Sequence, residues 1–121
     1  MVVRCMARDL NLPVEIVGVP TVRETDGLAL SSRNVYLSAE ERRIAPTLHH
    51  VMREAAAGIA RGQPPTPILE RAIAALTAAG FAVDYFELRD AETLAPFAET
   101  RRGRLLAAAH LGRTRLIDNL P

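Results

Sequence analysis

The chain of 121 residues is 49% hydrophobic and 24% charged, which is typical of one globular domain and excludes a disordered or fibrous protein. Fifteen basic residues against fourteen acidic ones leave a net charge of +1, so no global field would gather nucleic acid or an anionic membrane, and phosphate affinity must be local. A single cysteine excludes an intrachain disulfide, and no apolar run approaches the roughly 20 residues of a membrane-spanning helix, which predicts a cytoplasmic protein.

A short helix followed by a buried strand is expected at the start of the chain. The apolar residues that fall on one helical face are Val2, Val3, Met6 and Leu10. Residues 11–13, Asn-Leu-Pro, end this pattern, and the β-branched run at residues 14–19 between two prolines predicts a strand of a parallel sheet. No other strand and helix unit precedes this pair in the sequence, so we expect the chain to be truncated at its N-terminus.

Residues 21–37 are polar and predict a loop or loose hairpin that turns at Asp26 and Gly27. Two hydroxyls and a guanidinium follow in direct succession at Ser31, Ser32 and Arg33. An arginine can bind two phosphate oxygens, and serine hydroxyls with turn amides can add further donors, which together would form a phosphate clamp. The alternative is a solvated hairpin whose Ser and Asn side chains satisfy the turn backbone, and spacing alone favours it.

Two helices are expected next. Ser38 and Glu41 form a capping box that begins the first of them. Pro46 lies within the helical pattern, which predicts either a kink or a short helix that ends near Ala45, with helix continuing to about Arg61.

A proline-rich connector at residues 64–67 leads to the second helix, with Thr66 as its cap, Pro67 as its first residue and Gly80 at its end.

Three strands are expected in the remainder, over residues 83–88, 104–111 and 114–120. Gly112 and Arg113 between the last two suit a type II′ turn. The predicted fold class is α+β, a small three-stranded antiparallel sheet packed with two helices, and we expect Tyr85 and Phe86 in its core.

The other polar residues predict structural roles. His49 and His50 are adjacent on a helix and so point to different sides, which favours packed or solvated roles over a metal site, and His110 is expected to be partly buried. Three carboxylates lie along a strand without a second convergent cluster and predict no metal site: Asp84, Glu87 and Asp90. Three arginines surround Gly103 and predict a solvated turn, with a phosphate-binding patch as the alternative: Arg101, Arg102 and Arg104.

The run VEIVGVPTVRETDGLALSSRNVYLS resembles the signature segment of pantothenate synthetases. The resemblance continues through VDYFELRD and GRLLAAAHLGRTRLIDNL, so it covers essentially the whole chain. It implies that residues 23–121 are a C-terminal lid domain. Residues 1–22 would then be the last helix and strand of a truncated Rossmann-like domain, with a hinge at residues 20–23.

The resemblance also implies an activity in the nucleotidyltransferase superfamily. The family condenses pantoate with β-alanine using ATP, through a pantoyl adenylate, and forms pantothenate, AMP and pyrophosphate. The loop at Ser31, Ser32 and Arg33 corresponds to the Lys-Met-Ser-Lys-Ser loop of class I aminoacyl-tRNA synthetases, which closes over the triphosphate of Mg²⁺-bound ATP. Leu30 stands where relatives have Met or Leu. Val22 would offer its backbone to the adenine, and Arg33 would neutralise charge on the departing pyrophosphate.

Part of the family's active site has no match in this chain. The family's His-x-Gly-His element is absent, since the histidines are His49, His50 and His110 only. Pantoate- and β-alanine-binding residues lie mostly upstream in relatives, so we expect this fragment alone to be inactive and its parent enzyme to be a homodimer.

Two other functions remain open. One is a stand-alone nucleotide-binding or interaction module without catalysis. The other is a structural domain in which residues 14–19 pair between copies. No nucleic acid or membrane partner is expected.

Overall fold

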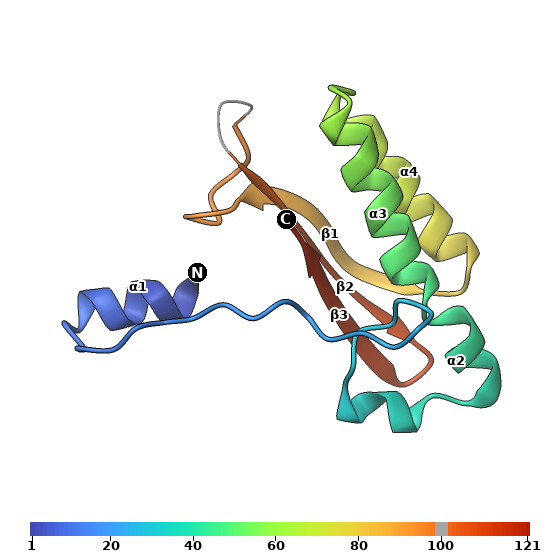
Figure 1. Cartoon of the computed structure of the whole chain (residues 1–121). Coiled ribbons are helices and arrows are strands. Elements are labelled where there is room, and N and C mark those ends of the chain that lie inside the picture. Colours follow the sequence, from blue (N-terminus) through green and yellow to red (C-terminus); the bar gives the residue numbers. More distant parts are fainter. Residues whose placement is uncertain (99–101) are drawn as a thin grey trace.

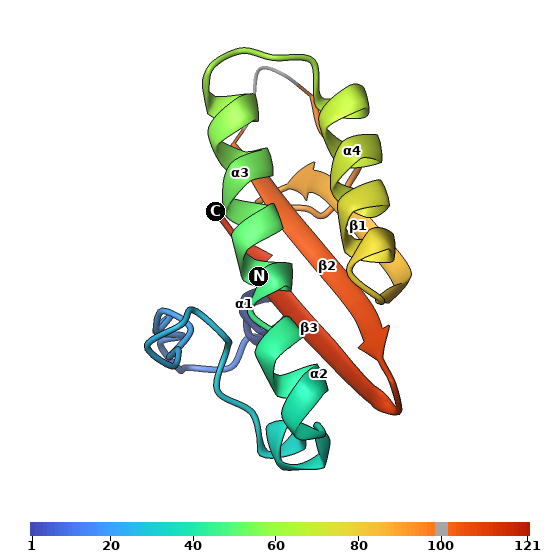
Figure 2. The same ribbon diagram turned by 90° about the vertical axis from the view of Figure 1, so that its right-hand side faces the viewer.

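A three-stranded antiparallel sheet forms the centre of the molecule, whose computed structural model describes residues 1–98 and 102–121. The strands lie in the order β1 (Ala82–Asp90), β2 (Gly103–Leu111) and β3 (Thr114–Leu120). Figure 1 and Figure 2 show that the two longest helices, α3 (Thr47–Ala60) and α4 (Pro65–Ala78), cover one face of this sheet. The predicted α+β architecture is confirmed.

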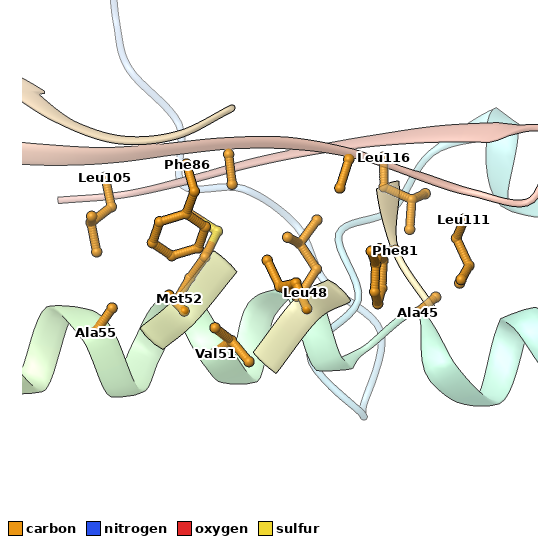
Figure 3. Close-up of a cluster of buried hydrophobic side chains, with 14 of the residues drawn as sticks. Ala45, Leu48, Val51, Met52, Ala55, Phe81, Phe86, Leu105, Leu111 and Leu116 are labelled. Carbon is orange, nitrogen blue, oxygen red and sulfur yellow. The ribbon is translucent and has the colours of Figure 1, made fainter. Parts of the chain in front are cut away.

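The core fills the space between α3 and the sheet. Its residues on α3 recur at the spacing of one helical face: Leu48, Val51, Met52 and Ala55. Figure 3 shows Leu48 and Met52 pointing towards the sheet, where Phe86 of β1, Leu105 of β2 and Leu116 of β3 lie. Met52 is fully buried, so its truncation to alanine should cost about 2–5 kcal/mol of unfolding free energy.

Helix α4 packs closely on α3 because Gly58 has no side chain. A Cβ at Gly58 would lie 2.9 Å from Cδ1 of Ile68 on α4. The start of α4 differs from the prediction: Pro64 is the N-cap, Pro65 is the first helical residue, and Thr66 makes no capping hydrogen bond. Proline suits the first helical position because that position needs no backbone donor.

Within the described residues, no helix is both long and apolar enough to span a membrane.

Of the two alternatives expected at Pro46, the structure has the short helix that ends near Ala45. Helix α2 (Ala39–Ile44) begins with the predicted capping box, in which Ser38 Oγ accepts from Glu41 N at 3.2 Å and Glu41 Oε2 accepts from Ser38 N at 2.7 Å. The helix ends before Pro46, and α3 begins at Thr47.

A β-bulge at Asp84 and a tight turn at Gly112 shape the sheet. The pairing passes from Val83 with Ala109 to Tyr85 with Ala108, which leaves Asp84 as the extra residue. A type II′ turn has positive φ at the first of its two central residues only. This holds here, because φ is 56° at Gly112 and is not positive at Arg113.

Phe86 is 4% exposed, as predicted, but Tyr85 is 38% exposed and its expected core position is wrong. Neighbouring strand residues point to opposite faces, and the helices cover only one of the two faces of this sheet.

The N-terminal segment lies apart from the sheet (Figure 1). Helix α1 (Val2–Asp9) forms as predicted, but residues 14–19 are extended without belonging to any strand, so that prediction is wrong for this structure. A strand needs a second strand beside it to pair its backbone groups, and among the described residues no strand lies beside this segment. Instead, Arg4 Nε donates to the carbonyl of Ile16 at 3.2 Å, which holds the segment along α1.

Candidate functional site

A tight hairpin over residues 22–30 carries the candidate site. Arg23 and Ala29 form an antiparallel bridge, and the predicted turn at Asp26 and Gly27 is present. Gly27 has φ of 92°, and a Cβ there would lie 2.7 Å from Cδ2 of His49. Only glycine satisfies both the backbone conformation and the close approach of α3 at this position.

Ser31, Ser32 and Arg33 follow the hairpin directly and lie on the surface. Ser31 is the N-cap of the 3₁₀ helix η1 (Ser32–Tyr36), because its Oγ accepts from Arg33 N at 3.2 Å. The side chains of Ser32 and Arg33 form no hydrogen bond or ion pair within residues 1–98 and 102–121. Ser31 therefore satisfies the turn backbone, as expected if the hairpin were merely solvated. The side chains of Ser32 and Arg33 remain available to a ligand.

Asn34 connects η1 to the hairpin. Its Nδ2 donates to the carbonyl of Ala29 at 3.0 Å and to Oε1 of Glu24 at 3.4 Å. Its Oδ1 is buried without a hydrogen-bond partner in the described part of the chain. Asn34 thus holds the backbone beside Arg33 against the hairpin. The sequence pattern did not single out this role.

A buried ion pair joins the hairpin to the sheet. Arg23 donates to both carboxylate oxygens of Asp118 on β3, at 2.6 Å and 2.8 Å, and also to the carbonyl of Gly27 at 3.1 Å. The side chains of Arg23 and Asp118 are only 18% and 3% exposed. A paired guanidinium and carboxylate at this depth hold the hairpin strongly, because separating them would leave a buried charge.

A second set of ion pairs joins the hairpin to α2. Arg42 donates to Oε2 of Glu24 and to Oδ2 of Asp26, both at 2.6 Å. The hydrogen bond from Arg42, with a further one from the Leu28 amide, lowers the pKa of Asp26. These three side chains are about one-third exposed, so the pairs stabilise the hairpin less than the Asp118 pair does.

His49 packs under the hairpin, so of the packed and solvated roles predicted for it, the structure shows the packed one. Burial, and then the positive charge of Arg23, lower the pKa of His49, while the Asp118 carboxylate opposes this shift. His49 Nδ1 lies 3.4 Å from Oδ2 of Asp118 but has no hydrogen-bond partner in the described residues. His50 is solvated, with a side chain 73% exposed, and His110 is partly buried as expected.

A hollow of about 410 Å³ lies between the hairpin and the edge strand β3. Leu30, Ser31 and Arg33 line it from the hairpin side, and Asp118 and Asn119 line it from β3. The structure therefore brings three of the five predicted ATP-binding residues to one hollow. The same loop presents Ser32 on its exposed surface.

Val22 does not line this hollow, but it is exposed beside it at the base of the hairpin. Its carbonyl accepts from the Leu30 amide at 3.0 Å, and its own amide has no backbone partner among the described residues. That amide is free for a ligand.

The remaining sequence candidates lie elsewhere. Arg104 donates to Oδ1 of Asn119 at 3.0 Å, and Arg102 is exposed. Arg101 lies outside the described residues. Within those residues, no group of three or more His, Cys, Asp or Glu side chains is arranged to hold a metal ion.

The Arg23–Asp118 and Arg42 contacts were not found from the sequence. One signal was present: Asp118 stands at the helix-facing phase of a strand whose other members at that phase are Thr114, Leu116 and Leu120. A carboxylate at a buried position requires a partner. Nothing in the local pattern says that this partner is Arg23, which lies 95 residues away.

Comparison with known proteins gives a single family. The family model described as pantoate-beta-alanine ligase matches residues 1–121. The chain is 57% identical to the pantothenate synthetase of Rhodopseudomonas palustris, over 98% of this chain and 43% of that protein. It is also 57% identical to the pantothenate synthetase of Caulobacter vibrioides, over 98% of this chain and 44% of that protein. The chain thus spans less than half the length of these curated relatives.

Solved structures agree with the sequence comparison. The crystal structure of pantothenate synthetase from Thermus thermophilus matches with a TM-score of 0.88 and 46% identity, over 98% of this chain and 44% of that one. A pantoate-beta-alanine ligase from Francisella tularensis, described as complexed with beta-gamma ATP and beta-alanine, matches with a TM-score of 0.68 over 98% of this chain and 37% of its own. At 24% identity, that second likeness concerns the fold alone. Because the family model matches from the first residue to the last, the chain belongs to the pantoate–beta-alanine ligase family.

Proposed function

We propose that this chain is the nucleotide-closing part of an ATP-dependent pantoate–β-alanine ligase. Residues 23–121 are its lid domain, and residues 1–22 are the end of a Rossmann-like domain, in which residues 14–19 would pair as a strand with neighbours outside these 121 residues. A hinge at residues 20–23 joins the two. The observation that carries the proposal is the side chain of Arg33, which is free of partners in the described residues and closely follows a hairpin braced from two sides.

The reaction proceeds in two steps. The pantoate carboxylate attacks the α-phosphorus of ATP, which gives pantoyl adenylate and pyrophosphate. The β-alanine amine then attacks the acyl carbon of the adenylate, which gives pantothenate and AMP. The first step leaves negative charge on the departing pyrophosphate, and a cation held in place beforehand stabilises that charge most effectively.

Each loop residue has a defined task in that first step. The guanidinium of Arg33 binds two phosphate oxygens at once. Ser32 Oγ donates a further hydrogen bond, and Ser31 can donate its hydroxyl proton while its oxygen accepts from Arg33 N. The amide of Val22 binds the adenine, and Leu30 packs beside the nucleotide. Mg²⁺ arrives with ATP as part of the substrate complex and screens the same oxygens.

The lid completes a site whose other groups lie outside these 121 residues. It would close on ATP and exclude the water that hydrolyses an acyl adenylate. The same resemblance supports a homodimeric, cytoplasmic parent enzyme, with ATP, pantoate and β-alanine as the small-molecule partners of the two domains.

A chimera tests the proposal. Residues 1–121 replace the matching part of the Rhodopseudomonas palustris protein, and pantothenate formation is measured. We expect an active chimera, in which Arg33→Ala slows single-turnover adenylate formation by about 10²–10³-fold, the usual effect of removing one transition-state donor. Arg61→Ala, at the exposed C-terminal end of α3, is the charge-matched control and should leave the rate unchanged. An Arg33→Ala chimera as fast as the unsubstituted one contradicts the proposal.

A second candidate is a nucleotide-binding module that needs no other domain. The braces at Asp118 and Arg42 lie within the chain itself, so the loop has a defined shape without further contacts. Titration calorimetry of the 121-residue chain with Mg-ATP separates the candidates. Binding that Arg33→Ala abolishes favours the module, whereas no binding means that the clamp forms only against another domain.

A further inference from the structure

A second hollow, of about 540 Å³, lies on the other side of Arg33, towards the turn between β2 and β3. Arg33 and Tyr36 line it from η1, and Arg113, Thr114 and Arg115 line it from the turn and β3. Three of its five lining residues are arginine and none is acidic. We call it the arginine hollow.

Two of the three positive charges in the arginine hollow have no counter-charge among the described residues. Arg115 Nε donates to Oδ2 of Asp84 at 2.7 Å, so this guanidinium already has a carboxylate partner. The guanidinium groups of Arg33 and Arg113 have neither an ion pair nor a hydrogen bond within residues 1–98 and 102–121. Two unpaired guanidinium groups that face one hollow repel each other, and an anion placed between them removes that cost.

The turn that carries Arg113 is held against the start of α2. Gly112 has positive φ, and a Cβ there would collide with the Glu41 carboxylate, so the tip of the turn lies directly on that side chain. Glu41 is fixed in turn by accepting from Ser38 N at 2.7 Å in the capping box of α2. Because η1 ends only a few residues before α2, Arg33 and Arg113 stand on supports that cannot move apart freely.

We propose that the arginine hollow is a diphosphate site, in which Arg113 binds the same pyrophosphate group as Arg33 from the opposite side. A diphosphate has two phosphoryl groups and so offers one to each guanidinium, whereas orthophosphate offers only one. The assignment rests on the proposed function, since the adenylation step produces pyrophosphate. Arg113 is thereby a second cation for the β- and γ-phosphates of ATP and for the product they form.

The binding test uses the 121-residue chain with inorganic pyrophosphate and, separately, orthophosphate, in titration calorimetry at low and high NaCl concentration. We expect pyrophosphate to bind more tightly than orthophosphate, and both affinities to fall as salt rises. Arg113→Ala should weaken pyrophosphate binding about 10-fold or more, since it removes a charge-assisted contact. Arg113→Lys should recover part of the loss, because lysine keeps the charge without the fork.

Arg61→Ala is the matched control, and its pyrophosphate affinity should be that of the unsubstituted chain. Equal weakening by Arg61→Ala and Arg113→Ala would reduce the effect to net charge and overturn the site. Equal affinity for pyrophosphate and orthophosphate overturns the diphosphate assignment. Thermal unfolding of each variant shows whether a loss of binding follows from a loss of fold.

The chimera separates this inference from the proposed function. In an active chimera, Arg113→Ala should raise the inhibition constant of pyrophosphate about 10-fold or more and leave the KM for β-alanine unchanged. Unchanged pyrophosphate inhibition overturns the role of Arg113 while the ligase assignment stands. An inactive chimera whose isolated chain still binds pyrophosphate through Arg33 and Arg113 removes the ligase assignment and keeps the diphosphate site.

Discussion

The hairpin and the N-terminal segment are both irregular stretches of chain, but their surroundings differ. The hairpin at residues 22–30 is tied to β3 through Asp118, to α2 through Arg42 and to η1 through Asn34. The segment at residues 14–19 has one side-chain hydrogen bond, from Arg4, and its valines are 57% to 80% exposed. A loop without regular structure can therefore be well defined, provided that distant residues satisfy its polar groups.

The largest effect is expected where the hairpin meets the sheet. Asp118→Asn leaves the guanidinium of Arg23 largely buried without a counter-charge, which should lower the free energy of unfolding by about 3 kcal/mol. Urea unfolding measures the change. Asp84→Asn removes a carboxylate from a more exposed pair with Arg115 and should cost about 1 kcal/mol or less. Similar losses for the two variants would mean that the Asp118 pair is not the main brace.

A slightly smaller effect is expected at the turn of the hairpin. Gly27→Ala forces alanine into positive φ and places its Cβ against the His49 ring, so we expect a loss of about 2–3 kcal/mol. Gly80→Ala is the control: φ is 96° there, but nothing lies within 4 Å of the added Cβ, so only the backbone strain of about 1 kcal/mol remains. Thermal or urea unfolding compares them, and equal losses would show that the approach of His49 is unimportant.

Acid should weaken the hairpin region through His49. The pKa of His49 is lowered in the folded state, so below pH 6.5, its ordinary value, the unfolded chain binds a proton that the folded chain resists. This contribution to stability is fully present above pH 6.5 and declines as pH falls towards the folded pKa. The free energy of unfolding, measured from pH 7.5 down to about 5, should therefore decrease as the pH decreases. His49→Gln should remove the His49 contribution to this pH dependence.

His50→Gln is the control for that titration, since His50 is solvated and lies one residue away. An unchanged slope in His49→Gln would assign the pH dependence to other groups. Asp26 and Glu87, whose pKa values are also lowered, act in a different window, below their ordinary values near pH 4.

The smallest effect is expected in the N-terminal segment. Val17 is 71% exposed, so Val17→Ala should change the free energy of unfolding by less than about 0.5 kcal/mol. The same substitution at Val51, a core residue that is 7% exposed, should cost about 1–3 kcal/mol. A large loss at Val17 in the isolated chain would mean that the segment packs against something, and the contrast with the hairpin would then disappear.

Local patterns predicted most of the fold because the interactions that decide them are local. The capping box at Ser38, the break at Pro46 and the turn at Gly112 each depend on residues a few positions apart. Strand alternation likewise placed Phe86 in the core. It could not place Tyr85, because a pattern does not state how many faces of a sheet are covered.

The candidate site was predictable in part. The sequence pointed to Ser31, Ser32 and Arg33, and to the hairpin that carries them. It did not separate Ser31, which caps η1, from Arg33, whose side chain has no partner in the described residues. It also did not connect Arg113 with Arg33, because their proximity depends on how the turn after β2 meets α2.

By itself, the sequence determined the α-helices apart from the start of α4, the three strands of the sheet, the turns and the family to which the chain belongs. Propensity, capping and turn chemistry act over a few residues, and a signature segment is a property of the sequence alone. The tertiary structure decided which charges are paired. Asp118 meets Arg23 across 95 residues, and Arg33 and Arg113 meet in one hollow, because the packing of α2, η1 and β3 sets those distances. For the same reason, residues 14–19 have strand-like side chains but form no strand, since pairing requires a neighbour as well as a propensity.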